Sequence, residues 1–161
     1  MLVILAAGPC CKYNIRMSVE PEEAARDIVT RCLCMRTRML ERIVGALYAP
    51  GAQRHGLSVA QVTLLAAIVR YPGARGSDLA KALVLDRSTL SRTLRKLIEL
   101  GLVETRPGEG RNVHHLPTRE GRERLTAVHA DWADAQEQAE ALLADQAEAV
   151  TALVRGLTAT P

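Results

Sequence analysis

The stretch that decides the fold runs from residue 86 to residue 101 and reads DRSTLSRTLRKLIELG. Its large apolar residues recur at helical spacing and define one buried face: Leu90, Leu94, Leu97 and Ile98. Asp86 predicts the N-cap of this helix, because its carboxylate can accept a hydrogen bond from an unpaired backbone N–H. Gly101 predicts the left-handed residue that ends the helix. The stretch therefore predicts an amphipathic helix that runs to about Leu100.

The neighbouring segments complete a recognisable unit. In LVETRPGEGRNVHHL, residues 102–116, the apolar period changes to two. This pattern predicts a strand over 102–106, a turn over 107–110 and a return strand over 111–116. On the other side, Ser77 is expected to cap a short helix over 78–83. Two tightly joined helices followed by a hairpin form a winged helix-turn-helix.

The flanking segments are predicted to be helical. The first begins with Pro21 and ends at Ala49-Pro50-Gly51, and it carries two apolar stripes. A helix with two apolar stripes is expected to be buried on two sides. The chain's own domain can cover one stripe, and a second subunit is the simplest partner for the other. Thr118 is expected to cap a long final helix that breaks near Asp145.

The predicted fold class is mainly α with a small β-hairpin wing, in which a winged helix-turn-helix lies between dimerisation helices. We expect a flexible leader over 1–20, for which Met17 offers a second start site. The other regions are an N-terminal dimerisation helix over 21–49, a DNA-binding lobe over 57–118 and C-terminal dimerisation helices over 119–161.

Composition excludes several classes of protein. The 161 residues are 48% hydrophobic and 24% charged, as in soluble globular proteins. No apolar run approaches the ~18 residues that a membrane helix needs, so we expect a cytoplasmic protein without a membrane partner. The net charge of +3 is uneven, because residues 70–119 carry +5 and residues 120–161 carry −5. A basic middle segment is typical of a surface that binds a polyanion.

The solvent side of the helix that follows Asp86 collects basic and hydroxyl side chains: Arg87, Ser88, Thr89, Ser91, Arg92, Arg95 and Lys96. Arginine can pair bidentately with guanine, and hydroxyls can contact bases or phosphates. Arg106 and Arg111 flank the hairpin turn, from which an arginine can enter a minor groove. Arg75 and Ser77 complete the predicted DNA-binding set. The alternatives are a solvated helix face and a winged helix that binds protein instead of DNA.

The order of these segments resembles the MarR family, the multiple-antibiotic-resistance regulators of bacteria. The resemblance spans residues 27 to about 157 and rests on GLSVAQ (56–61), DRSTLSR (86–92), GLV (101–103), EGR (109–111) and TREG (118–121). It implies a homodimeric repressor whose first and last helices interlock, and a dimer should select an inverted repeat in double-stranded DNA. It also implies an effector crevice between the dimer helices and the DNA-binding lobe. Glu109, Gly110 and Pro117 depart from the usual family residues.

Cysteines supply one candidate signal. All four lie in the first quarter, at 10, 11, 32 and 34, which is typical of a reduced compartment. Arg31 and Arg38 lie at helical spacing from Cys34, and nearby guanidinium groups favour a reactive thiolate. We expect Cys34, with Cys32 of the other subunit, to sense oxidants. The alternative is that both cysteines only pack as small apolar residues.

A small organic effector, such as an aromatic acid, is the other candidate signal, in a crevice lined in part by Met35, Met39 and Tyr48. No phosphate-binding glycine loop, HExxH or GxSxG motif occurs, so we expect no enzymatic activity. The four histidines lack the spacing of metal ligands, and no metal or cofactor is expected.

Overall fold

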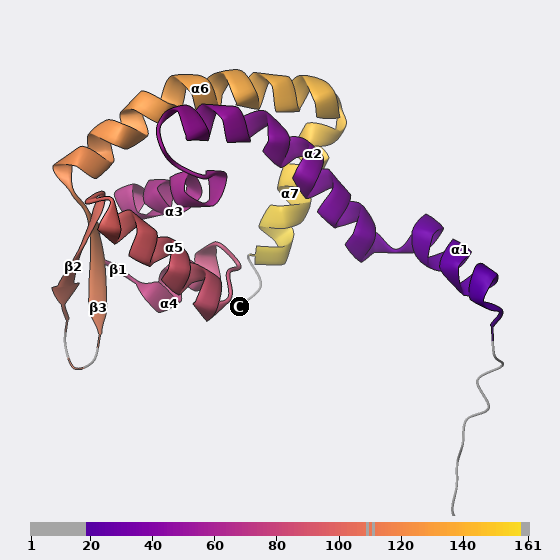
Figure 1. Ribbon diagram of the computed structural model, residues 1–161, viewed down its shortest axis with the longest axis horizontal. Coiled ribbons are helices and arrows are strands. Elements are labelled where there is room, and N and C mark those ends of the chain that lie inside the picture. Colours follow the sequence, from indigo (N-terminus) through magenta and orange to yellow (C-terminus); the bar gives the residue numbers. More distant parts are fainter. Residues whose placement is uncertain (1–18, 109, 111, 159–161) are drawn as a thin grey trace, which may run out of the picture. The chain divides into compact units, whose positions relative to one another are not determined.

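The structure, a computed structural model, describes residues 19–108, 110 and 112–158 and divides the chain into two units. The first unit ends at Met39 and contains α1 (Pro21–Arg31) and the beginning of α2 (Leu33–Arg54). The second unit begins at Leu40 and contains the rest of α2 and every later element (Figure 1). The predicted leader lies outside the described residues up to position 18.

The second unit is a winged helix-turn-helix. After α2 it contains, in chain order, α3 (Val59–Arg70), β1 (Ala74–Arg75), α4 (Gly76–Ala82), α5 (Arg87–Glu99), β2 (Val103–Pro107), β3 (Val113–Pro117), α6 (Arg119–Leu143) and α7 (Gln146–Thr158). The three strands form an antiparallel sheet in the order β1-β3-β2. The predicted mainly helical fold with a small hairpin wing is therefore confirmed. Strand β1 was missed, because two residues are too few to show a strand period.

Several predicted helix ends are confirmed by their hydrogen bonds. The Asp86 side chain accepts a hydrogen bond from the backbone N–H of Thr89 and so caps α5, which begins at Arg87. Gly101 has the left-handed φ of +70° that ends α5. The Thr118 hydroxyl accepts from Gly121 N at 3.0 Å and donates to the carbonyl oxygen of Gly101 at 2.7 Å. The same side chain thus begins α6 and ties it to the end of α5.

The prediction of one continuous N-terminal helix over 21–49 was wrong at both ends of α2. The chain leaves helical geometry at Cys32, where φ is −68° and ψ is 107°, and α2 then continues through Pro50 to Arg54. No glycine or proline occurs at the first break, and the apolar period continues across it. The sequence pattern therefore predicts no interruption of the helix there. Proline removes one backbone donor from a helix, but beyond Pro50 the helix contacts α6, where Gly51 lies close to Asp131 and Arg54 donates a hydrogen bond to the Asp131 carboxylate.

Two further predictions were wrong in detail. Ser77 does not cap α4, because α4 begins one residue earlier and Arg75 stands at its N-cap without a side-chain hydrogen bond. Ile98 is 41% exposed, because it lies at the edge of the apolar stripe whose centre contains Leu90, Leu94 and Leu97.

None of the helices among the described residues has the length and apolar character needed to cross a membrane.

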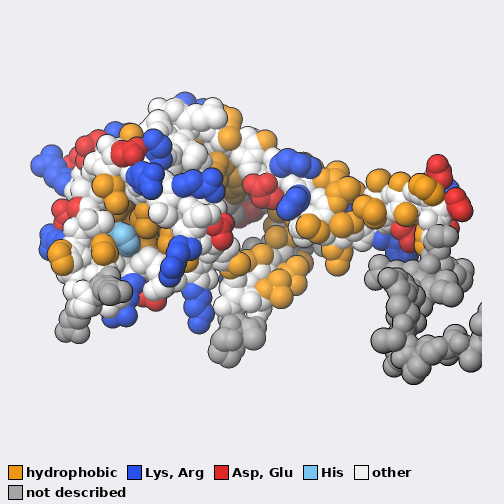
Figure 2. Space-filling model, turned by 60° about the horizontal axis from the view of Figure 1, so that its bottom comes forward, with side chains coloured by type: hydrophobic (Ala, Val, Ile, Leu, Met, Phe, Trp, Pro, Cys, Tyr) orange, Lys and Arg blue, Asp and Glu red, His pale blue; other side chains and the backbone are white. Residues whose placement is uncertain are grey.

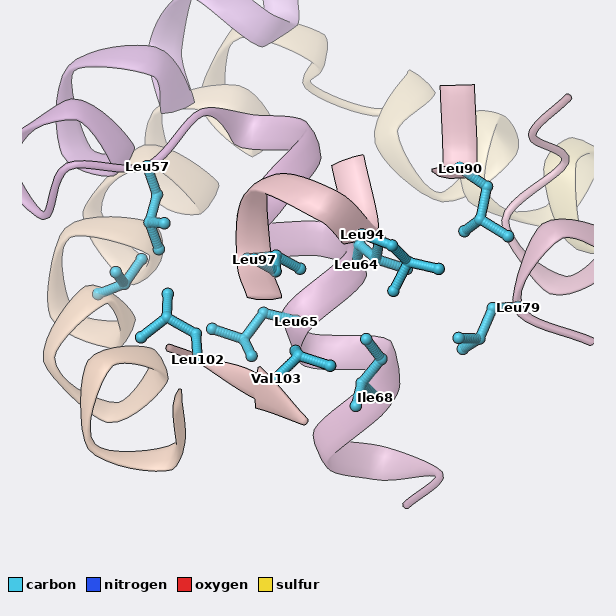
Figure 3. Packing of buried hydrophobic residues seen from close by; sticks show 11 residues of the cluster. Leu57, Leu64, Leu65, Ile68, Leu79, Leu90, Leu94, Leu97, Leu102 and Val103 are labelled. Atoms are coloured by element: carbon cyan, nitrogen blue, oxygen red, sulfur yellow. The ribbon is translucent and has the colours of Figure 1, made fainter. Parts of the chain in front are cut away.

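The core lies between α3, α5 and the first strand of the wing (Figure 3). Leu64, Leu65 and Ile68 of α3 are completely buried, and Leu97 of α5 packs in the same cluster. Leu102 closes the core where α5 leads into β2. The chain has no Phe, so branched aliphatic side chains supply the buried apolar area.

Gly121 allows α6 to pass directly over the backbone of Leu102. A Cβ at position 121 would lie 2.1 Å from the carbonyl oxygen of Leu102, and a backbone oxygen cannot rotate away like a flexible side chain. We expect Gly121→Ala to lower the free energy of unfolding by about 1–3 kcal/mol, measured by urea denaturation.

Gly156→Ala in α7 is the matched control, because its Cβ would meet no heavy atom within 4 Å. There the higher helix propensity of alanine should leave stability unchanged or raise it by up to about 1 kcal/mol. Equal effects of the two substitutions would contradict the close contact between α6 and Leu102.

Candidate nucleic-acid interface

Helix α5 is anchored by one face and exposes the other. Leu90, Leu94 and Leu97 are buried in the core, so their packing fixes the rotation of the helix. The opposite face exposes the four predicted cations, Arg87, Arg92, Arg95 and Lys96. Figure 2 shows Lys and Arg side chains projecting on the face of the second unit that carries α4 and the wing. The structure therefore holds a cationic helix face outward on a rigid support.

Asp86 organises the first turn of α5. Its carboxylate accepts hydrogen bonds from the hydroxyls of Ser88 (2.5 Å) and Thr89 (2.6 Å) and from the Thr89 backbone N–H (2.9 Å). These bonds, first those from Ser88 and then those from Thr89, hold the pKa of Asp86 far below its usual range. The two hydroxyl protons are thus already committed, and each hydroxyl oxygen retains capacity to accept from a ligand.

The cations of α5 differ in their partners. Lys96 pairs with Glu99 at 2.7 Å, at the end of the helix away from its N-cap. Arg92 donates to the hydroxyl of Thr89 at 3.2 Å and forms no ion pair with any described residue. Arg87 and Arg95 likewise have no acidic partner in the described part of the chain. Three arginines of this face are therefore not neutralised by neighbouring carboxylates there.

The wing brings two further cations into one row. In the strand register, Arg75 of β1 and Arg106 of β2 both lie opposite His114 of β3. Residues paired across antiparallel strands point to the same side of a sheet, so the three side chains share one face. Arg106 is paired with Glu104 on its own strand at 2.8 Å. Arg111, the other predicted wing arginine, lies outside the described residues, as does Glu109.

A hollow of about 550 Å³ runs along α5 and brings four of the predicted residues together: Ser77, Arg87, Ser91 and Arg95. His115 of β3 also lines it and is only 8% exposed. The Nδ1 atom of His115 has no hydrogen-bond partner within the described structure. Burial, and secondarily the neighbouring His114, lower the pKa of His115, so the ring is neutral at physiological pH.

A separate cavity of about 670 Å³ lies between α2, α3 and α6. Tyr48, one of the three residues predicted for an effector crevice, lines it. The other two, Met35 and Met39, belong to the first unit. Sequence reasoning missed the remaining aromatic and charged lining residues, which are Glu41, His129 and Trp132. The sequence contains one sign of them: Glu41 lies at helical spacing from Tyr48, and His129 and Trp132 lie at helical spacing from Leu125.

Asp131 joins α2 to α6 beside this cavity. Its carboxylate accepts hydrogen bonds from Arg54 and from Nε2 of His55, the latter at 2.7 Å. Arg54 first and His55 second lower the pKa of Asp131. Gly51 permits the close approach, because a Cβ there would lie 2.9 Å from the Cβ of Asp131. The sequence offered no local sign of this link, because its members lie more than 70 positions apart.

The sensor candidates lie at the break between α1 and α2. Cys32 is partly buried and its Sγ accepts a hydrogen bond from Met35 N at 3.4 Å, whereas Cys34 is exposed. Both are free thiols. Cys32 lies outside both helices, at the C-cap of α1, whereas Cys34 lies in the first turn of α2. The described residues contain no cluster of three or more His, Cys, Asp or Glu that could hold a metal ion.

Comparison with known proteins agrees with this geometry. Residues 55–111 match the MarR family. At the level of sequence alone, no curated protein matches the chain. The M. tuberculosis transcriptional regulator MosR, solved in complex with DNA, is 28% identical, with a TM-score of 0.70 over 79% of this chain and 93% of that one.

Two further structures are similar. A MarR family transcription regulator is 26% identical, with a TM-score of 0.65 over 83% of this chain and 93% of that one. A mutant MarR from E. coli, complexed with operator DNA, is 21% identical and shares the fold, with a TM-score of 0.71 over 81% of this chain and 96% of that one. The chain therefore has the winged helix-turn-helix fold of these regulators, and its segment over residues 55–111 is similar to the MarR family.

Proposed function

We propose that the chain is a sequence-specific regulator of transcription that binds double-stranded DNA as a homodimer, acts as a repressor and is released by a signal. The observation that carries the proposal is the exposed cationic face of α5, which points outward because Leu90, Leu94 and Leu97 on the opposite face are buried. A helix of this kind fits a DNA major groove, where arginine reads guanine and neutralises phosphate. The row formed by Arg75 and Arg106 lies where a wing can contact the adjacent groove.

A second copy of the chain is the proposed partner for the exposed apolar side chains at both ends. Ile28 and Val29 of α1 are each 60% exposed, and Leu157 of α7 is 72% exposed. Figure 2 shows hydrophobic side chains along the surface of α1. Isolated apolar residues on a surface are ordinary, but rows of them on terminal helices are typical of subunit interfaces. A symmetric dimer would present two α5 helices to an inverted repeat.

Oxidation is one proposed release signal. Peroxide would oxidise the exposed Cys34 thiol to a sulfenic acid and be reduced to one water. Attack by the Cys32 thiol of the second subunit would then expel a second water and form a disulfide. The other proposed signal is a small organic effector, for which the cavity between α2, α3 and α6 supplies the volume.

Arg92→Ala tests direct base reading. If Arg92 makes a bidentate base contact, the substitution should cost ~1–3 kcal/mol of binding to an operator selected from random DNA, and less on shuffled DNA. Fluorescence anisotropy with labelled duplexes measures both affinities. Arg42→Ala, an exposed arginine of α2 outside the interface, is the control and should change neither. Equal losses on both duplexes would restrict Arg92 to phosphate contacts.

Salt dependence separates DNA binding from a winged helix that binds only protein. If several of the α5 and wing cations contact phosphates, the logarithm of the association constant should fall steeply and linearly with the logarithm of salt concentration, by about 0.9 per phosphate contacted. Absence of any DNA binding at low salt would refute the proposed function.

Cys34→Ser tests the redox signal. Reduced wild-type protein should bind its operator, and peroxide treatment should release it, whereas Cys34→Ser should stay bound because no sulfenic acid can form at that position. Cys11→Ser is the matched control and should respond like the wild type. Release of Cys34→Ser by peroxide would exclude this cysteine as the sensor.

A further inference from the structure

The cavity between α2, α3 and α6 is built from one stripe of each helix. Glu41, Val44, Tyr48 and Ala52 of α2 recur at helical spacing along it, and Leu125, Val128, His129 and Trp132 form the matching stripe of α6. Valine, alanine and leucine side chains make up most of its wall. With a volume of about 670 Å³, it is large enough for a drug-sized organic molecule.

Glu41 is the one acidic side chain among the described residues that line this cavity, and His129 also lines it. Glu41 contributes a carboxylate, and no lysine or arginine of the described chain lines the cavity. Glu41 forms no ion pair with a described residue. The Tyr48 hydroxyl donates to Oε1 of Gln136 at 2.6 Å, and both burial and the Glu140 charge raise the pKa of Tyr48. A ligand carboxylate would therefore meet negative charge here without a cation to pair with.

The aromatic side chains of the lining favour the opposite kind of ligand. Trp132 and Tyr48 both line the cavity, and the His129 ring lies 5.6 Å from the Trp132 ring. Electron-rich aromatic faces attract organic cations even at exposed sites, and Trp132 is 43% exposed. We infer that the cavity binds a hydrophobic organic cation, whose ammonium group lies near Glu41 and the aromatic rings and whose apolar body fills the aliphatic part.

This inference deepens the proposed function and rests on it only for what binding does to DNA affinity. Val62 and Ala66 of α3 line the cavity, while Leu65 and Ile68 of the same helix pack in the core with α5. A ligand that shifts α3 would therefore also shift the support of α5. The ligand class differs from the aromatic acid expected from the sequence, because the lining lacks the cation that an acid requires.

A matched set of three ligands tests the charge preference directly. They are 4-tert-butylbenzylammonium, 4-tert-butylbenzyl alcohol and 4-tert-butylbenzoate, which share one apolar body. Trp132 is the only tryptophan of the chain and lines the cavity, so its fluorescence reports binding without DNA. Calorimetry provides an independent affinity. We expect the ammonium compound to bind at least about tenfold more tightly than the carboxylate, with the alcohol between them.

Glu41→Gln should weaken binding of the ammonium compound about two- to fivefold and leave the alcohol unchanged, because only the charged ligand loses a partner and Glu41 is exposed to solvent, where ion pairs are weak. Glu137→Gln, an exposed acid on α6 outside the lining, should change neither. Tightest binding of the carboxylate, an unchanged ammonium affinity in Glu41→Gln, or no binding of any of the three compounds would overturn the inference.

The DNA assay keeps the two proposals separate. If the protein binds DNA but prefers the carboxylate, the inference fails and the proposed function stands. If the ammonium compound binds as expected but no DNA is bound at low salt, the proposed function fails and the cavity assignment stands.

Discussion

The burial of one side of α3 is the constraint on which the rest of the second unit depends. Leu64, Leu65 and Ile68 are fully buried and pack with the apolar face of α5 and the start of β2. The other side of the same helix lines the cavity with Val62 and Ala66. Because a close-packed interior resists small displacements of one element alone, the position of α3 sets both the outward face of α5 and the shape of the cavity.

The sequence predicted those helix ends that are set by residues a few positions away, and it did not predict those that depend on distant residues. Asp86, Gly101 and Thr118 act on residues within a few positions, and all three helix-end predictions were confirmed. Pro50 is also a local signal, but α2 continues past it to Arg54, which contacts Asp131 of α6, and no residue near Pro50 in the sequence reveals that contact. The break at Cys32 carries no glycine or proline, so neither composition nor period could mark it.

The residues of the candidate site were also predicted only where a local pattern in the sequence determines their position. The exposed arginines of α5 follow from the apolar period, because the polar face of an amphipathic helix is fixed once its buried face is known. The row of Arg75, His114 and Arg106 depends on strand register, which a two-residue strand does not reveal. The cavity needs three helices from distant parts of the chain. Of the three residues predicted for it, Met35, Met39 and Tyr48, only Tyr48 lines it, and the contribution of Glu41 was not predicted.

His115 is buried beside α5 as a neutral ring, and no described residue forms a hydrogen bond with its Nδ1, so a proton binds more readily to this histidine in the unfolded chain than in the folded one. Its folded pKa lies below that of an unfolded histidine, so below about pH 6.5 the unfolded state binds more protons and stability falls as acid is added. Asp86, whose folded pKa is depressed, begins to lose its stabilising contribution only when the pH falls into the ordinary carboxyl range near 4, where the unfolded chain takes up the proton first. Mild acid therefore weakens the support under α5 before it disturbs the cap at the start of that helix.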